Sequence, residues 1–273
     1  MERGSKIPRY LFDRKDHELI QIVNDVLRSS KFARKLYFPY FHPNGIKEMA
    51  ETKGLRSAYA VVQLLSSLEI GGVEERLNAL RSLRLEVIDT AEGPMPKNTA
   101  RVLLQIMKNL VRAYGDPLRQ LELAHDFRMT ASGKPRVVRR QLRQHHLLEM
   151  PEEWNQITFD DHVHDVNTKG RKSSTHLIMD AWIKGIRRLR VIHYNFIEPR
   201  FAAELFEAAR VLDIDVRIGI EFSARFRDKY VQLIWVPRGF ADSQAFLCFL
   251  AEPAVMSLME AGQRASCYQQ EYV

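Results

Sequence analysis

Cysteine is scarce in this chain, and long apolar runs are absent. Cys248 and Cys267 are the only two cysteines among 273 residues, which excludes a disulfide framework and favours a reducing cytoplasm. No uninterrupted apolar stretch approaches the roughly 18 residues of a membrane-spanning helix. With 45% hydrophobic and 27% charged residues, the composition predicts a soluble globular protein of one or two domains.

Acidic residues are missing from one segment of the first half. Six cations and no acid lie between Asp126 and Glu149: Arg128, Lys134, Arg136, Arg139, Arg140 and Arg143. Residues 1–150 hold 26 Lys and Arg against 17 Asp and Glu, a net +9, whereas residues 151–273 hold 15 against 17, a net −2. This asymmetry predicts a basic domain over 1–150 and a second domain over 151–273.

Clustered cations repel one another unless phosphates or acidic side chains approach them. We therefore expect DNA or RNA to contact the first domain through Arg136, Arg139, Arg140 and Arg143. The alternative interpretation is a solvated connecting helix.

The first half has mainly helical periodicity. Apolar residues recur at helical spacing over 16–35, 45–67, 72–85, 98–114 and from 117 onward, and a basic helix is expected over 136–148. Asn98 is a candidate N-cap, residues 85–89 are a candidate short strand, and the aromatic segment 36–45 is a candidate loop or docking segment.

The second half alternates strands with helices. A strand-like run at 157–166 contains His162 and His164, whose side chains leave one face of a strand together. Further strands end at His193 and Glu221, with helices expected over 173–189 and 199–212. Such alternation predicts parallel βαβ units, whose functional groups gather at the carboxyl ends of the strands. Imidazoles with one carboxylate form a ligand set for zinc, manganese or iron.

Residues 157–236 resemble the start of a PHP domain, the polymerase and histidinol phosphatase family of metal-dependent phosphoesterases. The resemblance rests on Asp161-His162-Val163-His164, on Val191-Ile192-His193-Tyr194-Asn195, and on Gly219-Ile220-Glu221-Phe222-Ser223. It implies a distorted βα barrel of the TIM type with parallel strands, carrying a metal cluster that hydrolyses phosphomonoesters or phosphodiesters. His162, His164 and Glu221 are then the metal ligands.

The chain departs from the family pattern at several points. It has His193-Tyr194 where the family has Asp-His, and no histidine follows His193 to supply the later ligands. About 117 residues follow position 156, whereas a closed βα barrel needs roughly 200 or more. We therefore expect an incomplete half-barrel that a partner chain or a longer parent completes.

Hydrolysis at this site would give roles to further residues. His193 is a ligand or the acid for the leaving group, and Asp165 or Asp161 is a further ligand or proton acceptor. Cations in the loops after the strands are expected to bind a phosphate substrate: Lys169, Arg171, Lys172, Arg225 and Arg227. The alternatives are a catalytically inert PHP-like module acting in nucleic-acid binding or complex assembly, and another barrel hydrolase such as an amidohydrolase-like enzyme.

Overall fold

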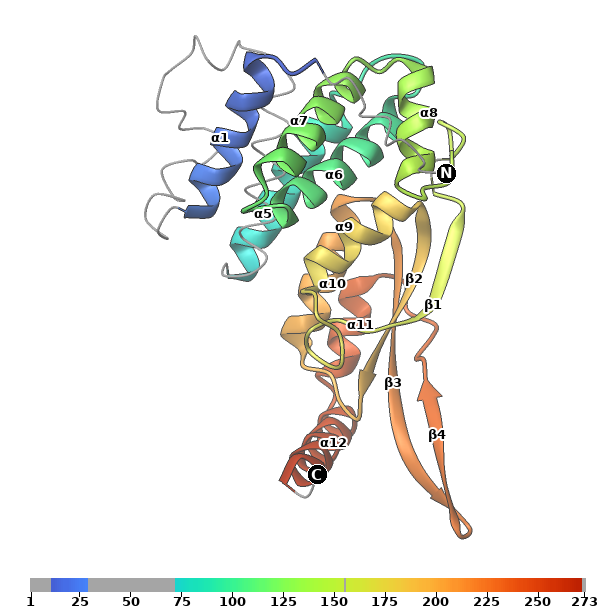
Figure 1. Cartoon of the computed structure of the whole chain (residues 1–273). Helices are drawn as coiled ribbons and strands as arrows, with labels where there is room; N and C mark the ends of the chain where they lie inside the picture. Colours follow the sequence, from blue (N-terminus) through green and yellow to red (C-terminus); the bar gives the residue numbers. More distant parts are fainter. Residues whose placement is uncertain (1–10, 29–71, 155, 272–273) are drawn as a thin grey trace, which may run out of the picture. The chain divides into compact units, whose positions relative to one another are not determined.

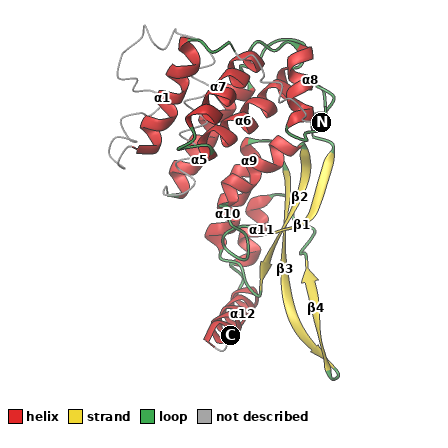
Figure 2. Ribbon diagram, in the orientation of Figure 1, coloured by secondary structure: helices red, strands yellow, loops and turns green. Residues whose placement is uncertain are grey.

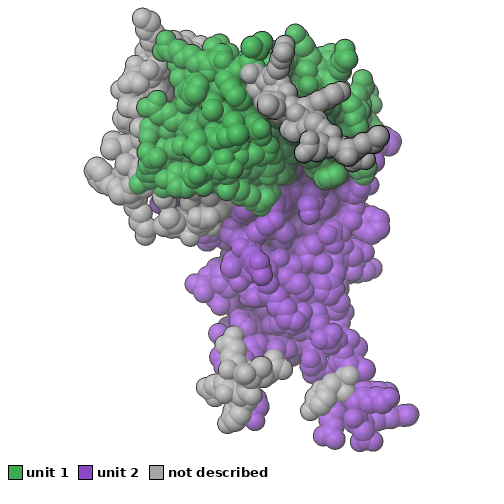
Figure 3. Space-filling view, viewed as in Figure 1, with its two compact units in different colours: residues 1–70, 82–153 green, residues 71–81, 154–273 purple. Residues whose placement is uncertain are grey.

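The structure, a computed structural model, describes residues 11–28, 72–154 and 156–271 (Figure 1). Helices predominate, and all the strands found in those ranges lie in the second half of the chain (Figure 2). The chain divides into two compact units, residues 1–70 with 82–153 and residues 71–81 with 154–273 (Figure 3). This division differs from the predicted one because residues 71–81 belong to the second unit. The aromatic segment 36–45 and the expected helix 45–67 lie outside the described residues.

The first unit is helical where it is described. Its elements are α1 (Arg14–Arg28), a π-helical turn η1 (Arg84–Ile88), α6 (Pro96–Arg112), α7 (Pro117–Ala131) and α8 (Pro135–Gln144). The last three helices begin with proline, whose fixed φ and missing N–H suit the first helical position. Their apolar faces form a core of fully buried side chains that includes Leu104, Ile106, Leu110, Leu123 and Val138. The predicted helical character of this part is confirmed.

A buried ion pair ties α1 to α7. The Asp16 carboxylate is fully buried and accepts from Arg128 Nε at 2.7 Å. Asp13 lies 3.2 Å from the same guanidinium. One of the six cations of the basic segment is therefore neutralised within the unit, and it is not available to an external anion.

Two local predictions in the first unit are wrong. Residues 85–89 continue the preceding helix as a π-helical turn, with Val87 buried, and form no strand. Asn98 lies inside α6, where its Nδ2 donates to Met150 O at 2.7 Å. The free backbone N–H groups at the start of α6 are satisfied from a distance, because the Glu152 carboxylate accepts from Lys97 N at 2.8 Å and from Asn98 N at 3.2 Å.

The second unit contains a curled, mixed four-stranded sheet. It comprises the first part of α5 (Val73–Leu83), β1 (Thr158–Val163), α9 (Ser174–Lys184), β2 (Ile186–Tyr194), α10 (Pro199–Val211), β3 (Asp215–Phe226), β4 (Lys229–Trp235), α11 (Ser243–Leu250) and α12 (Pro253–Glu271). The strand order is β1-β2-β3-β4. The first three strands are parallel, as predicted.

The fourth strand corrects the expectation of an entirely parallel sheet. β4 pairs with β3 in the antiparallel direction. Only Arg227 and Asp228 separate the two strands, and a connection of two residues forms a hairpin, whereas a parallel crossover needs a dozen or more. β3 also runs on past Glu221 to Phe226, so this glutamate lies within its strand rather than at the end.

Helices α9 and α10 pack on one face of the sheet. Side chains on that face, such as Leu189, Val191 and Ile218, are buried. A bidentate pair from Arg76 to the Glu204 carboxylate, at 2.9 and 2.7 Å, joins α5 to α10 and explains why residues 71–81 belong to this unit.

None of the helices in the described ranges is both long and apolar enough to cross a membrane by itself. Ser243–Leu250 and Pro253–Tyr268 satisfy the length and composition requirement only as a pair, with a 71° bend between them.

Candidate metal centre

Two imidazoles meet where β1 ends. His162 is the fifth residue of β1, and His164 follows the strand directly. Their Nε2 atoms lie 3.2 Å apart, and the ring planes are inclined at 74°. The prediction that this His-x-His pair shares one side of the strand is confirmed.

The His164 ring is held in one orientation. Its Nδ1 lies 2.7 Å from the carbonyl oxygen of Ile192 on β2. A carbonyl only accepts, so Nδ1 carries the proton and Nε2 of the neutral ring keeps its lone pair. Tyr194 stacks on the imidazole with centroids 5.1 Å apart and planes within 15°. A carbonyl partner on the far nitrogen is the usual support of a metal-binding histidine.

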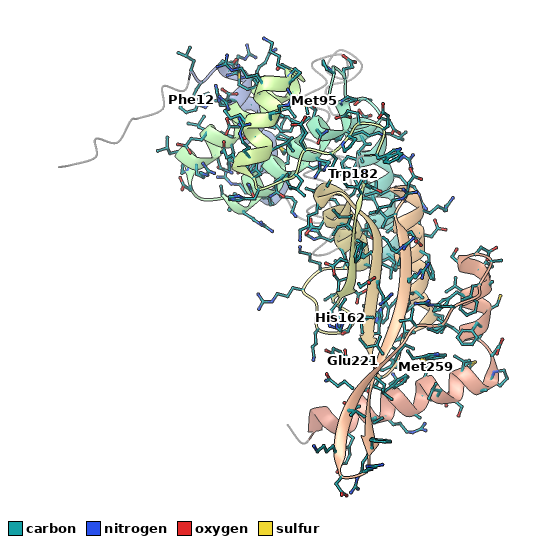
Figure 4. All side chains as sticks on the ribbon, turned by 90° about the vertical axis from the view of Figure 1, so that its right-hand side faces the viewer. Phe12, Met95, His162, Trp182, Glu221 and Met259 are labelled. Atoms are coloured by element: carbon teal, nitrogen blue, oxygen red, sulfur yellow. The ribbon has the colours of Figure 1, made fainter. Side chains whose placement is uncertain are left out.

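Glu221 supplies the acid of the group. It is paired in register with Tyr194, and in a parallel pair both side chains leave the same face of the sheet. Glu221 is 5% exposed, and its buried Oε2 lies 3.7 Å from His162 Nε2 without a hydrogen bond to a described residue. Figure 4 shows His162 and Glu221 together on the sheet. A buried carboxylate oxygen with no donor is costly unless a cation approaches it.

The three side chains fit a metal ion. One atom from each of His162, His164 and Glu221 lies within 4.8 Å of the other two. Donors that share one ion at about 2.0–2.2 Å lie about 3.3 Å apart, so the imidazole pair already has this spacing and the carboxylate needs a small approach. Two nitrogens and one oxygen suit zinc, manganese or iron and leave positions for water or substrate.

Asp165 does not join this group. It is fully buried, and its carboxylate accepts from Ser174 Oγ at 2.7 Å and from Asn167 N and Nδ2 at 3.0 Å. Its backbone oxygen accepts from Gly170 N at 2.7 Å. The predicted proton acceptor therefore fixes the loop behind His164, and it is a positioning residue. The alternative acceptor, Asp161, is directed to Arg190 at 3.5 Å.

His193 is on the other side of the sheet. It pairs in register with Ile220, one position before the pair of Tyr194 with Glu221. Because side chains alternate along a strand, the His193 ring projects from the face of the sheet that α9 and α10 cover. It is 2% exposed, and burial lowers its pKa, with Asp165 opposing that shift and His164 adding to it. The structure does not bring this predicted catalytic residue to the metal ligands.

The predicted phosphate-binding cations lie in two separate parts of the second unit. Lys169 donates to Tyr194 Oη at 2.6 Å and lies over the ring of Tyr194. Arg171 is exposed in the same loop. Arg225 and Arg227 lie on the β3–β4 hairpin, where Arg225 Nε donates to Arg227 O, and not in a loop around the ligand group. The expectation failed for these two because β3 continues past Glu221.

The predicted nucleic-acid contacts lie on α8 in the first unit. All four arginines, Arg136, Arg139, Arg140 and Arg143, are exposed. Arg139 pairs with Glu149 at 3.0 Å. The other three form no ion pair with any residue in the described part of the chain.

Sequence reasoning missed the residues that support the ligands. Tyr194 stood out only as a departure from the family pattern, yet it stacks on His164 and accepts from Lys169. Gly170 packs against the backbone of His164 and Asp165, with the Asp165 carbonyl oxygen 2.6 Å from an added Cβ. A glycine six residues after a histidine carries no local signal, so only the folded loop reveals it.

Comparisons with known proteins give no relative: no protein family, no curated protein and no solved structure matches this chain.

Proposed function

We propose that this chain is a metal-dependent hydrolase of phosphate esters with a PHP-like, half-barrel arrangement of its second unit. One observation carries the proposal: two imidazole nitrogens and a buried carboxylate oxygen without a donor converge from separate strands. The order of the ligands, the three parallel strands and the curled sheet all agree with the family resemblance.

In this proposal His162, His164 and Glu221 hold the ion. A bound divalent ion supplies a water of lowered pKa and stabilises negative charge on phosphoryl oxygens. Ile192 O keeps the His164 Nε2 lone pair directed toward the ion, because it holds the proton on Nδ1. Lys169 places a cation beside Tyr194, where it attracts an anionic substrate.

The test combines metal content with activity. We expect purified protein to bind zinc, manganese or iron, and to hydrolyse bis(p-nitrophenyl) phosphate or p-nitrophenyl phosphate in their presence. His162→Ala is expected to lose both properties, whereas His17→Ala, which removes an exposed histidine of α1, keeps them. A panel of amides separates phosphoesterase from amidohydrolase activity. Wild-type protein that binds no metal, or His162→Ala protein that binds as much metal as His17→Ala, would sink the proposal.

A second candidate is a nucleic-acid-binding role of the first unit, with or without catalysis in the second. It is favoured by Arg136, Arg140 and Arg143, which project from α8 at helical spacing without an acidic partner among the described residues. We expect single-stranded DNA or RNA to bind with a steep salt dependence, and each Arg→Gln change to reduce the slope of log K against log salt by about one. Fluorescence anisotropy measures this slope, and an unchanged slope in the triple variant would remove the candidate.

A further inference from the structure

The sheet face that carries the ligand group also carries two arginines directly opposite each other. Arg190 on β2 pairs in register with Arg217 on β3. Each lies four residues before Tyr194 or Glu221, so by alternation all four side chains leave one face. The alternate residues of the two strands, such as Val191 and its partner Ile218, project from the opposite face and are buried under the helices there.

This pair is unfavourable by itself. Neighbouring strands are about 4.8 Å apart, and like charges directly opposite on a sheet destabilise it. The next cation along β2 has its own partner, because Arg188 Nε donates to Asp215 at 2.9 Å. Asp215, which lies two residues before Arg217 on β3, is therefore already paired with Arg188.

Neither guanidinium of the pair is well satisfied. The nearest acid to Arg190 is Asp161, at 3.5 Å from Nη2, which is too long for a strong bond. Arg190 Nε is buried and donates to no residue in the described ranges. Arg217 is half-buried and forms no hydrogen bond or ion pair with a described residue. Two fork-shaped donors side by side, without an acid between them, match the oxygens of a phosphate.

We propose that Arg190 and Arg217 form an anion site, and that it binds a second phosphate group of the molecule whose first phosphate lies at His162, His164 and Glu221. The claim that both phosphates belong to one molecule rests on the proposed function, whereas the anion site does not. Glu221 lies four positions after Arg217, and a strand rises about 3.3 Å per residue, so the two sites are about 13 Å apart along the strand.

Apolar residues separate the two sites. Gly219 and Ile192 are in register midway between them, and a Cβ on Gly219 would lie 2.7 Å from Ile192 Cδ1. No charged group of this face stands between the sites on β2 and β3. Ile192 and Gly219 are themselves buried, so a spacer would pass outside them. The spacing of the two sites matches a ligand with two phosphates about 13 Å apart, such as a short single-stranded oligonucleotide.

The first experiment tests the anion site without metal. In EDTA, inorganic phosphate at ten times its Kd is expected to raise the Tm of the wild-type protein by about 3 °C. Arg190→Gln/Arg217→Gln is expected to show no rise, and without phosphate it should be at least as stable as the wild type because the repulsion is gone. Arg225→Gln/Arg227→Gln, which also removes two positive charges but from the hairpin, is the matched control and keeps the rise. If the Arg190→Gln/Arg217→Gln double variant does not fold, the phosphate-dependent Tm rise of Arg217→Gln alone is compared with that of the wild type.

An equal rise in the double variant, or no rise in the wild type, would overturn the anion site.

The second experiment tests the bridge between the sites. Oligothymidylates carrying one to six phosphates are titrated against metal-loaded protein. We expect affinity to increase by tenfold or more at the length that spans both sites, and this step to vanish in the double arginine variant and in His162→Ala. A smooth increase with length would refute the bridge. Retention of the phosphate-dependent Tm rise in His162→Ala separates the anion site from the proposed hydrolase function, because that rise needs no metal.

Discussion

The effect of one substitution on the free energy of unfolding should depend on whether metal is bound. Glu221→Gln keeps the size of the side chain and removes a buried charge that no described donor satisfies. In EDTA at pH 8, where imidazole is ordinarily neutral, we expect the variant to be within about 1 kcal/mol of the wild type or more stable, since an unsatisfied buried group costs about 1–3 kcal/mol. With metal at one hundred times its Kd, the wild type gains about 2.7 kcal/mol and the variant loses most of that gain.

Glu204→Gln is the contrasting control. Glu204 is as buried as Glu221, at 3% against 5% exposed, but it accepts from Arg76 and from Thr175 Oγ1 at 2.8 Å. Removing one partner of a buried pair costs about 3 kcal/mol, so this variant should be destabilised equally with and without metal. Urea unfolding of the three proteins in EDTA and in zinc or manganese measures both effects. A Glu221→Gln protein that loses several kcal/mol in EDTA would show that the carboxylate has a structural partner and would refute the metal-site reasoning.

Three further predictions concern the loop and the helices. Gly170→Ala places a Cβ against the backbone of His164, and we expect about 1–3 kcal/mol of lost stability together with weaker metal binding by calorimetry. Asp116→Ala removes the N-cap of α7, whose carboxylate accepts from the Arg119 backbone at 3.1 Å, and should cost about 1 kcal/mol in urea unfolding. Burial lowers the pKa of His145 below its usual 6.5. The unfolded chain therefore binds more protons than the folded one, so this contribution is complete above about pH 6.5 and is lost as pH falls. His145→Gln should flatten the stability profile between about pH 7 and 5, and an unchanged slope would contradict this.

The helical periods and the His-x-His spacing could be predicted because they are local. The pattern of apolar residues over 98–114 depends only on 3.6 residues per turn, and α6 forms there. The side shared by His162 and His164 follows from the alternation of a strand. The turn chemistry after Phe226 was not recognised, so the length of β3 and the direction of β4 were missed.

Register was the information that the sequence did not contain. His193 and Tyr194 are adjacent in the chain, and whichever of them pairs with Glu221 shares its face. The family pattern favoured His193 as the functional residue, whereas the observed register selects Tyr194 and directs His193 into the core under α9 and α10.

The sequence by itself determined the helical character of the first half, the alternation of strands with helices in the second half, and which residue types can bind a metal, because these follow from short-range periodicity and side-chain chemistry. Only the tertiary structure decided that the Glu221 carboxylate meets His162, that Asp165 is fixed by Ser174, and that Arg190 stands beside Arg217. These relations join residues from 9 to 59 positions apart, counted from Asp165 to Ser174 and from His162 to Glu221. Their distances are set by strand pairing and loop packing, which no local pattern encodes.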